Sequence, residues 1–573
     1  MDLLNQMKLS PLERFWKMLK PDSTEIKNVY TYAVFRGLVN LSMPLGIQAI
    51  INLIQGGRFS TSWVILVALV SGGIALTGLL QIYQLRIVEN LQQKIFARAA
   101  FEFAYRVPRI RMDQLSKLYA PELMNRFFDI INIQKGLTKI LIDFTAAALQ
   151  IAFGLTLLSF YHPFFILFSF LLILLLYLIF RLTARRGLET SLVESKNKYK
   201  TAHWLEELAR TNTTFKLSGK TNLPLKRTDE NVNNYLEARE SHFKILIRQF
   251  SLMIGFKVLI TIGLLAIGGI LVMEQLMNIG QFVAAEIIIL LIMSSVESLI
   301  KSLETIYDVL TGLEKVGQVT DLEIENQKGL DIEVECGSEG MEIEVTDLSF
   351  TYPDGESPEL KNLSFKVNRG EFVALVGEAG AGKSTLMRVL GGLYSIDKGQ
   401  IIFDEINKES FKPESLRSAI GDYLSQEDLF LGSVYENLTM GKDIGMDRIR
   451  EVVKNMHLID YINQLPKGFD TLLYPQGIGL AESTVQKLLL ARAILNRPKL
   501  LVIEENIDAI DKKQKSEIIA YLADRSNKWT TVIATKDEQI ISRSDKIMEL
   551  KEGELHFMGS YAEYQEHLNT NKK

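Results

Sequence analysis

Residues 371–391 of the chain read EFVALVGEAGAGKSTLMRVLG. The five apolar residues after the first glutamate predict a buried strand, and the residues from 383 onward predict a helix. The glycines between them let the backbone curl, so that successive N–H groups and the N-terminus of the helix point at an anion. These glycines are Gly377, Gly380 and Gly382. Strand, loop and helix together predict a phosphate-binding loop.

The polar residues after the last glycine give this loop its chemistry. Lys383 is expected to reach the β- and γ-phosphates of a nucleotide, and the hydroxyl of Ser384 to bind Mg²⁺. Thr385 continues the binding segment into the helix. A glycine-rich turn that matches by accident is the alternative, but both flanks supply the context that the motif requires. The sequence therefore predicts binding of ATP and Mg²⁺.

A second apolar run, KLLVIEE at residues 499–505, ends in two carboxylates. One carboxylate at such a position can hold Mg²⁺ through water, and the next can orient or deprotonate the water that attacks a phosphate. We assign the metal role to Glu504 and the catalytic role to Glu505. Two glutamates after a strand are common alone, but here they follow a phosphate-binding loop.

Length and composition show what these motifs are attached to. The chain has 573 residues, more than one ordinary domain, and is 47% hydrophobic. With 64 basic and 68 acidic residues the net charge is −4, and the basic residues cluster in loops, so nucleic acid is excluded as a main partner. The single cysteine, Cys336, excludes an internal disulfide framework and a cysteine metal site.

Six segments before residue 310 are long and apolar enough to cross a bilayer, which takes about 20 residues. They are approximately 28–55, 62–88, 137–160, 163–182, 247–273 and 280–300. The joins within each pair are short, whereas 89–136 and 183–246 are long and rich in lysine and arginine. The positive-inside rule places these two stretches, and both termini, in the cytoplasm, where ATP is available.

Buried helices of a large soluble protein are the alternative for these segments. The run LLILLLYLIF at 171–180 argues against it, because a helix of a soluble protein normally keeps one polar face. The chain is thus predicted to lie in the cytoplasmic (inner) membrane, with the lipid bilayer as a partner.

Several polar residues interrupt the predicted spans. They are Arg36, Gln48, Asp143, Gln150, Lys257, Glu286 and Glu297. Counting residues from the hairpin tips places Asp143, Lys257 and Glu297 at a similar depth, near the cytoplasmic edge. We expect Lys257 to pair with Glu297 or Asp143, and Glu286 to face the central path. Independent snorkelling of the four charges to the headgroups is the alternative.

The predicted fold is multidomain, with an all-α six-helix transmembrane domain followed by an α/β nucleotide-binding domain. Residues 1–24 are expected to form an interfacial helix, since 11–20 carry Leu12, Phe15, Trp16 and Leu19 on one face, with a soluble amphipathic helix as the alternative. The transmembrane domain with its long cytoplasmic extensions covers 25–320. An acidic, glycine-containing linker follows at 321–340. Strands then alternate with helices over 341–573, as in a mostly parallel sheet.

With these motifs in this order, the chain resembles the ATP-binding cassette (ABC) transporters, and among them half-transporters of the type I exporter class. The resemblance implies that Tyr352 stacks on adenine and that Gln426 binds Mg²⁺ and links the nucleotide to the membrane domain. Asp511 would belong to the D-loop, at 508–511. Family architecture further implies a dimer with two ATP molecules between the cassettes. It also implies coupling helices in the cytoplasmic stretches, for which Phe127-Phe128 and 204–217 are candidates.

The chain departs from the family pattern in the segment that would contact the partner's ATP. Where the family has L-S-G-G-Q, the chain has Leu480-Ala481-Glu482-Ser483-Thr484. A carboxylate at Glu482 repels a triphosphate unless its side chain turns away. The usual switch histidine is Lys536, and the usual aspartate before the catalytic carboxylate is Glu504. Such a chain is expected to be an ATPase with impaired hydrolysis.

Three functions follow from this pattern. The first is an ATP-driven exporter subunit that pairs with a second half-transporter, either a copy of itself or a different chain. The second is an ATP-binding membrane switch or scaffold that hydrolyses ATP slowly. The third, an importer-like role, is disfavoured because the membrane and ATP-binding parts lie in one chain. No aromatic cage or dense charge in the spans indicates the transported substrate.

Overall fold

The computed structural model describes residues 9–55, 61–116, 118–332, 339–425, 428–504, 507 and 509–571. The chain forms two compact units. The first comprises Met1–Pro108 and Tyr119–Leu322, and the second comprises Arg109–Leu118 and Glu323–Lys573. The division after Leu322 lies within two residues of the predicted end of the transmembrane domain. The segment Arg109–Leu118 differs, because the sequence places it in the transmembrane domain and the fold packs it with the cassette.

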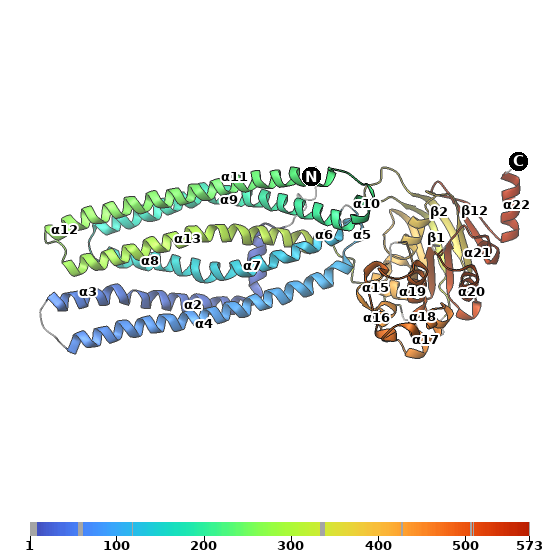
Figure 1. Ribbon diagram of the computed structural model, residues 1–573, viewed down its shortest axis with the longest axis horizontal. Coiled ribbons are helices and arrows are strands. Elements are labelled where there is room, and N and C mark those ends of the chain that lie inside the picture. The colour runs from blue at the N-terminus through green and yellow to red at the C-terminus, as the bar shows by residue number, and fades with distance from the viewer. Residues whose placement is uncertain are drawn as a thin grey trace. The chain divides into compact units, whose positions relative to one another are not determined.

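Long helices build the first unit (Figure 1). In chain order they are α1 (Pro11–Leu19), α2 (Ser23–Asn40), α3 (Ser42–Gln55), α4 (Thr61–Arg106), α6 (Ala120–Met124), α7 (Asp129–Thr138), α8 (Thr145–Ser159), α9 (Phe164–Arg210), α10 (Asn212–Leu217), α11 (Leu223–Gly263), α12 (Gly269–Met273) and α13 (Ile279–Thr320). Within the described residues, six helical stretches are long and apolar enough to cross a membrane. The predicted all-α six-helix architecture is therefore confirmed.

The helices extend well beyond the thickness of a bilayer. Helix α9 has 47 residues, so at about 1.5 Å per residue it is about 70 Å long, twice the hydrocarbon core. Its first 19 residues are almost entirely apolar, whereas about a third of the rest are charged. Helices α9 and α11 run side by side over much of their length (Figure 1). The charged halves correspond to the predicted cytoplasmic extensions.

Helix α13 is the most buried of these helices and occupies the centre of the unit's packing. Its Ile288 and Ile292 are 1% exposed and belong to one apolar cluster with Phe165 of α9. Helix α8 also packs closely against α13. Gly154 of α8 permits this, because a Cβ atom there would lie 2.9 Å from Ile292 of α13. Small residues at helix crossings bring backbones together, which is how membrane helices pack.

Helix α1 only partly matches the predicted interfacial helix. Ser10 and Glu13 form a capping box at its start. Phe15 and Leu19 are buried in the first unit, whereas Leu12 and Trp16 are more than half exposed. The predicted apolar face is therefore divided between the protein core and the surface. On the buried side, the Arg14 guanidinium donates two hydrogen bonds to the carboxylate of Asp321, just after α13, at 2.8 and 2.6 Å.

The predicted pairing of Lys257 is confirmed. Its ammonium group contacts the Glu297 carboxylate, and Lys301 donates to the same carboxylate at 2.6 Å. This contact joins α11 to α13. Asp143 instead lies within electrostatic reach of Arg36. Glu286 is half-buried, and its orientation toward a central path stays a prediction.

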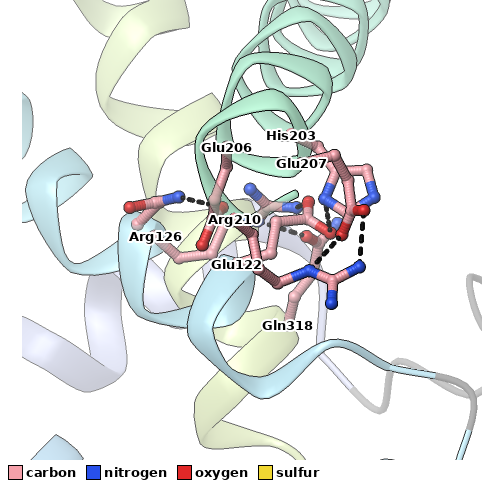
Figure 2. A network of polar contacts seen from close by, with 8 residues as sticks. Glu122, Arg126, His203, Glu206, Glu207, Arg210 and Gln318 are labelled. Atoms are coloured by element: carbon pink, nitrogen blue, oxygen red, sulfur yellow. Dashed lines mark hydrogen bonds and ion pairs between the residues drawn. The ribbon is translucent and has the colours of Figure 1, made fainter. Parts of the chain in front are cut away.

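A polar network joins three elements at one end of the first unit. Figure 2 shows it around Glu122 and Arg126, with residues of α9 and Gln318 of α13 beside them. Arg126 donates to Glu122 at 2.8 Å and to Gln318 at 3.2 Å. His203 of α9 lies 3.5 Å from Glu122. The network ties the turn before α7 to α9 and α13, within the predicted cytoplasmic extension.

Two sheets form the second unit. The central one has six strands in the order β12-β11-β3-β10-β9-β6, and its β11, β3, β10, β9 and β6 are parallel. Its strands are β3 (Phe372–Val376), β6 (Ile420–Tyr423), β9 (Leu500–Glu504), β10 (Thr530–Ala534), β11 (Lys546–Lys551) and β12 (Glu554–Gly559). The predicted α/β domain with a mostly parallel sheet is confirmed.

The other sheet is antiparallel, which the sequence analysis did not separate from the first. It runs in the order β2-β1-β4-β5, made of β1 (Ile343–Phe350), β2 (Leu360–Val367), β4 (Lys398–Phe403) and β5 (Ile406–Asn407). Buried and exposed residues alternate along β2, as in a sheet with one covered face. A short pair, β7 (Gly432–Ser433) with β8 (Leu472–Leu473), completes the strands of the described residues.

Helices surround the sheets of this unit. They are α14 (Lys383–Leu390), α15 (Pro413–Ala419), α16 (Val434–Thr439), α17 (Met446–Asn455), α18 (Ile459–Gln464), α19 (Glu482–Leu495), α20 (Lys512–Leu522), α21 (Glu538–Arg543) and α22 (Tyr561–Asn571). The short helix α5 (Met112–Leu115) also belongs here, since Ile110 pairs with Ile324 and Arg109 forms an ion pair with Glu414 at 2.5 Å. From Glu323 on, the described part of the predicted linker thus belongs to the cassette unit, whereas Asp321 and Leu322 belong to the first unit.

Candidate functional site

The phosphate-binding loop follows β3, whose five residues are all buried in the middle of the parallel sheet. Gly377 has φ +147°, and a Cβ atom there would lie 2.4 Å from the carbonyl oxygen of Leu550. Gly382 has φ +93° and caps the N-terminus of α14. Only glycine takes these conformations without strain, so the glycine spacing creates the tight strand-to-helix turn. Helix α14 begins at Lys383, as the sequence predicts.

The Lys383 side chain folds back over the loop. Its ammonium group donates to the carbonyl oxygens of Gly377 and Glu378, both at 2.7 Å. Burial and the neighbouring Lys536 lower the pKa of Lys383. Lys383 and Ser384 line a cavity of about 390 Å³ together with Glu504 and Lys536. Residues from three separate stretches of sequence, all predicted to act in nucleotide chemistry, therefore meet in one cavity.

Ser384 and Glu504 lie in contact at the floor of this cavity. The Ser384 hydroxyl donates to one carboxylate oxygen of Glu504, and the backbone N–H of Ser425 donates to the other at 3.0 Å. Burial alone would raise the pKa of Glu504, but these hydrogen bonds outweigh it and hold the pKa below its usual value. Glu504 is therefore an anion at neutral pH, as a group that holds Mg²⁺ needs to be.

An ion pair that the sequence analysis missed lines the same cavity. Lys515 of α20 lies 2.9 Å from Asp537, which follows Lys536 directly in the chain. Burial tends to raise the pKa of Asp537, yet Lys515 and the backbone N–H of Gln539 hold it below its usual value. The cavity wall thus carries three lysines, at 383, 515 and 536, and two carboxylates. A wall with this excess of positive charge attracts a polyanion.

Tyr352 is fixed beside the phosphate-binding helix. Its ring packs edge-on against Phe350, with the centroids 5.0 Å apart, and against Tyr394 at 5.5 Å. Its hydroxyl donates to Thr385 Oγ1 at 3.3 Å and accepts from Arg388 at 3.1 Å. The contact links Tyr352 and Thr385, two residues predicted to bind nucleotide, but stacking on adenine stays a prediction.

The altered signature segment lies at the start of α19. Ala481 occupies the N-cap position and offers no side-chain acceptor there. The Glu482 carboxylate is exposed and accepts from Gln486, one turn along the helix, at 3.4 Å. Among the described residues, the lining of the cavity around Lys383 does not include 480–484. One chain therefore does not bring its own signature segment to its own phosphate-binding loop.

Some predicted site residues fall outside the described part of the chain. Glu505, with its catalytic role, and Gln426, with its Mg²⁺ role, are among them, as are Asp508 of the D-loop and Cys336. Ser425, next to Gln426, contacts Glu504. Asp511, the other D-loop residue, caps the N-terminus of α20 by accepting from the N–H of Lys513 at 3.0 Å. The helix that carries Lys515 begins there.

Comparison with known families agrees with this geometry. Residues 29–296 match the ABC transporter transmembrane region, and residues 360–508 match the ABC transporter family. The two matches together cover most of the chain. The first lies largely in the first unit, and the second lies within the second unit.

Individual relatives match the chain over shorter stretches. The ATP-dependent lipid A-core flippase of Pseudomonas fluorescens is 32% identical over 286 residues, which is 50% of this chain and 47% of the relative. A putative multidrug export ATP-binding/permease protein of Staphylococcus aureus is 34% identical over 245 residues, 42% of each chain. These alignments thus span less than half of the length of each relative.

A solved structure matches the fold over nearly its whole length. It is a bacterial Atm1-family ABC exporter with ATP bound, with a TM-score of 0.79 and 18% sequence identity. The alignment covers 95% of this chain and 96% of that one. At this identity the likeness concerns the fold.

Proposed function

Because the chain belongs to the ABC transporter family, we propose that it is one subunit of a dimeric, ATP-driven exporter in the cytoplasmic membrane. The observation that carries this proposal is the cavity that unites Lys383, Ser384 and Glu504, in the same chain as six helices able to cross a membrane. The relatives named for lipid A-core flipping and multidrug export support the direction of transport. Both termini would lie in the cytoplasm.

The residues around the cavity have distinct roles in this proposal. Tyr352 stacks on the adenine, while the loop glycines and Lys383 hold the β- and γ-phosphates. Ser384 binds Mg²⁺, with Glu504 and Gln426 holding the same ion. Glu505 orients the attacking water. Lys536 donates to the γ-phosphate where the family has a histidine, but it cannot act as a neutral imidazole.

The second half of each ATP site comes from a partner subunit. In a head-to-tail dimer, the segment Leu480, Ala481, Glu482 and Ser483 faces the partner's γ-phosphate, with Asp511 nearby. The N-terminus of α19 directs partial positive charge toward that anion, but the Glu482 carboxylate stands in the first turn and opposes it. Hydrolysis by a homodimer is therefore slow. A heterodimer with an intact partner carries the altered signature at only one of its two sites.

A second function is favoured by the same segment. Ala481 removes the hydroxyl that would contact the γ-phosphate, so ATP can be bound without efficient turnover. The chain would then act as a nucleotide-dependent membrane switch or scaffold. ATP binding is common to both functions, and the rate of hydrolysis separates them.

ATP binding at this cavity is tested with the full chain in lipid nanodiscs. ATP with Mg²⁺ should raise the melting temperature, because a ligand that binds only the folded state stabilises it. Lys383→Ala should abolish this rise, since it removes the main cationic contact of the phosphates. The control is Lys467→Ala, at an exposed cassette lysine outside the lining of the cavity. An unchanged rise in Lys383→Ala would show that ATP binds elsewhere.

A further inference from the structure

Two of the six histidines of the chain converge with a glutamate on the far side of the cassette sheet from β6. They are His556 of β12 and His567 of α22, with Glu549 of β11. One ligand atom from each of the three lies within 4.8 Å of the other two. Glu549 Oε2 is 3.2 Å from His567 Nε2 and 3.9 Å from His556 Nδ1.

These separations suit a shared metal ion. With bonds of about 2.0–2.2 Å to imidazole nitrogen and carboxylate oxygen, the ligand atoms of a tetrahedral Zn²⁺ lie about 3.3 Å apart. Glu549 Oε2 is buried and accepts no hydrogen bond from the described residues. A carboxylate oxygen that faces imidazole nitrogens in this way needs a cation between them or a proton on a ring.

The backbone directs the side chains to this point. Strands β11 and β12 pair in the antiparallel sense, and Glu549 lies opposite Phe557 while Leu550 lies opposite Leu555. His556 is therefore the extra residue of a β-bulge. In a regular strand its side chain would point to the other face from that of Phe557, and a bulge re-aims a side chain in this way. The irregularity thus allows His556 to join Glu549 on one face.

Aromatic packing fixes the other histidine. The His567 ring stacks on Phe557, with centroids 4.9 Å apart and an interplanar angle of 28°, and it stacks on Tyr564 at 6.5 Å. Tyr564 is itself buried in a cluster with Val376, the residue just before the phosphate-binding loop. Ligands that are already oriented lose little freedom when a metal binds.

We propose that Glu549, His556 and His567 form a binding site for a divalent transition-metal ion, Zn²⁺ in the first instance. Two imidazoles and one carboxylate are a ligand set that Zn²⁺ takes, with a fourth position left for water. The His556 side chain is 46% exposed, so that position is open to solvent. The ion would link β11, β12 and α22. Glu549 pairs with Val376 of β3, so the metal site lies next to the strand that precedes the phosphate-binding loop.

The test uses the full chain in nanodiscs, without a histidine tag and stripped with a chelator. Co²⁺ serves as the probe, because a site with mixed nitrogen and oxygen ligands gives it visible absorption, and Zn²⁺ should displace it. We expect one Co²⁺ per chain. His556→Gln and His567→Gln should each lower the affinity for Zn²⁺ at least tenfold. Each should also remove the rise in melting temperature that Zn²⁺ produces.

His457→Gln is the matched control. His457 forms a pair with Glu517 at 2.9 Å in the same unit, and neither residue belongs to the three-residue group found among the described residues. Its substitution should leave Co²⁺ binding unchanged. His556 is exposed, so its variant is expected to fold, and an unchanged melting temperature without metal confirms that. Absence of stoichiometric Co²⁺ binding, or equal binding by the wild type and both site variants, would overturn the site and leave a histidine–glutamate ion pair only.

Discussion

At the level of single residues, Ser384 and Glu504 are in direct contact in the cavity. Glutamate is longer by one methylene than the aspartate that the family usually has, and here it reaches the serine hydroxyl itself. Hydrogen bonds from Ser384 and Ser425 stabilise the charged form of the Glu504 carboxylate. The Mg²⁺ position would therefore be held by a hydroxyl and a carboxylate that already touch.

Neutralising Glu504 should weaken the binding of Mg²⁺-ATP, but not the binding of ATP without Mg²⁺. We expect Glu504→Gln to lower the affinity for ATP in the presence of Mg²⁺ by about 10–100-fold, because it removes the negative charge that holds the ion. ATP binding with the metal chelated should change little. Nucleotide titrations with and without Mg²⁺ measure both quantities.

Glu356→Gln, at an exposed residue outside the lining of the cavity, is the control for that experiment. Equal losses of ATP affinity with and without Mg²⁺ in Glu504→Gln would contradict the metal role of Glu504.

Lys408 gives a residue-level prediction about pH. It is 7% exposed, its ammonium group donates to the Tyr394 carbonyl oxygen at 2.5 Å, and burial lowers its pKa from 10.5 to about 8. The unfolded chain thus holds this proton more tightly than the folded chain. The resulting loss of stability is fully present below pH 8 and shrinks as the pH rises toward 10.5.

Replacing Lys408 by methionine should therefore stabilise the cassette at pH 7, by at most about 3 kcal/mol. The lost hydrogen bond to Tyr394 offsets part of this gain. Melting temperatures of the wild type and Lys408→Met should converge as the pH rises from 7 to 10. The exposed Lys398 provides the control substitution. A constant difference across this pH range would refute the explanation.

A motif fixes the spacing of residues along the chain, and the fold brings three such motifs together. Lys383 with Ser384, Glu504 and Lys536 line one cavity, and their roles stay predictions. The Lys515–Asp537 pair could not be predicted, because the two residues lie on separate helix starts and only the fold brings them together. In the sequence, only the nearby predicted site residues Asp511 and Lys536 indicate that Lys515 and Asp537 lie near the nucleotide site.

At the scale of elements, charge pairing joins membrane helices that apolar packing alone would not orient. The Lys257–Glu297 contact connects α11 to α13, and both side chains are about 30% exposed. Depth counting from the hairpin tips predicted that Lys257 pairs with Glu297 or Asp143, because the rise per residue in a helix is constant, and the structure shows Glu297. The same counting could not predict the partner of Asp143, which depends on how neighbouring helices are rotated.

A double-mutant cycle tests the energetic role of this pair. Lys257→Met leaves Glu297 with Lys301 alone, and Glu297→Leu leaves Lys257 without its carboxylate partner. Each single variant should lose about 1–3 kcal/mol of stability, and Lys257→Met with Glu297→Leu should lose less than the sum of the two. Unfolding in mixed micelles measures these free energies. Strictly additive losses would show that the contact contributes nothing.

The segment Arg109–Leu118 belongs to the cassette unit, whereas the sequence places it in the predicted transmembrane domain. Its Arg109 and Ile110 contact the cassette, and its only α-helix in the described residues, α5, has four residues. A helix this short has no periodic pattern to detect, and the long charged stretch around it is typical of a cytoplasmic extension. The coupling candidates Phe127-Phe128 and 204–217 lie in the other unit, and their role stays a prediction.

At the scale of the whole molecule, the sequence predicted both units and their order. Long apolar helices and a glycine-rich loop are strong local signals, and each determines its own unit. The separate antiparallel sheet was not predicted, because the strands after residue 341 follow one another along the chain and were assigned to a single, mostly parallel sheet. One chain does not form the complete predicted ATP site, because the altered signature segment does not line the chain's own cavity among the described residues.

We propose that this chain binds ATP as an exporter subunit and that Ala481 and Glu482 make its hydrolysis slow. The most direct measurement is ATP turnover by the purified homodimer in lipid, compared with Ala481→Ser combined with Glu482→Gly. The serine hydroxyl that Ala481→Ser introduces would restore a cap for α19 as well as a phosphate donor, so the double variant is expected to fold.

Hydrogen bonds to charged groups contribute about 1.5–3 kcal/mol each, so the altered signature should slow turnover by orders of magnitude. We predict low turnover by the wild type, at least a tenfold increase in the double variant, and loss of that increase when Lys383→Ala is added. Brisk turnover by the wild type that the double substitution leaves unchanged would contradict the account.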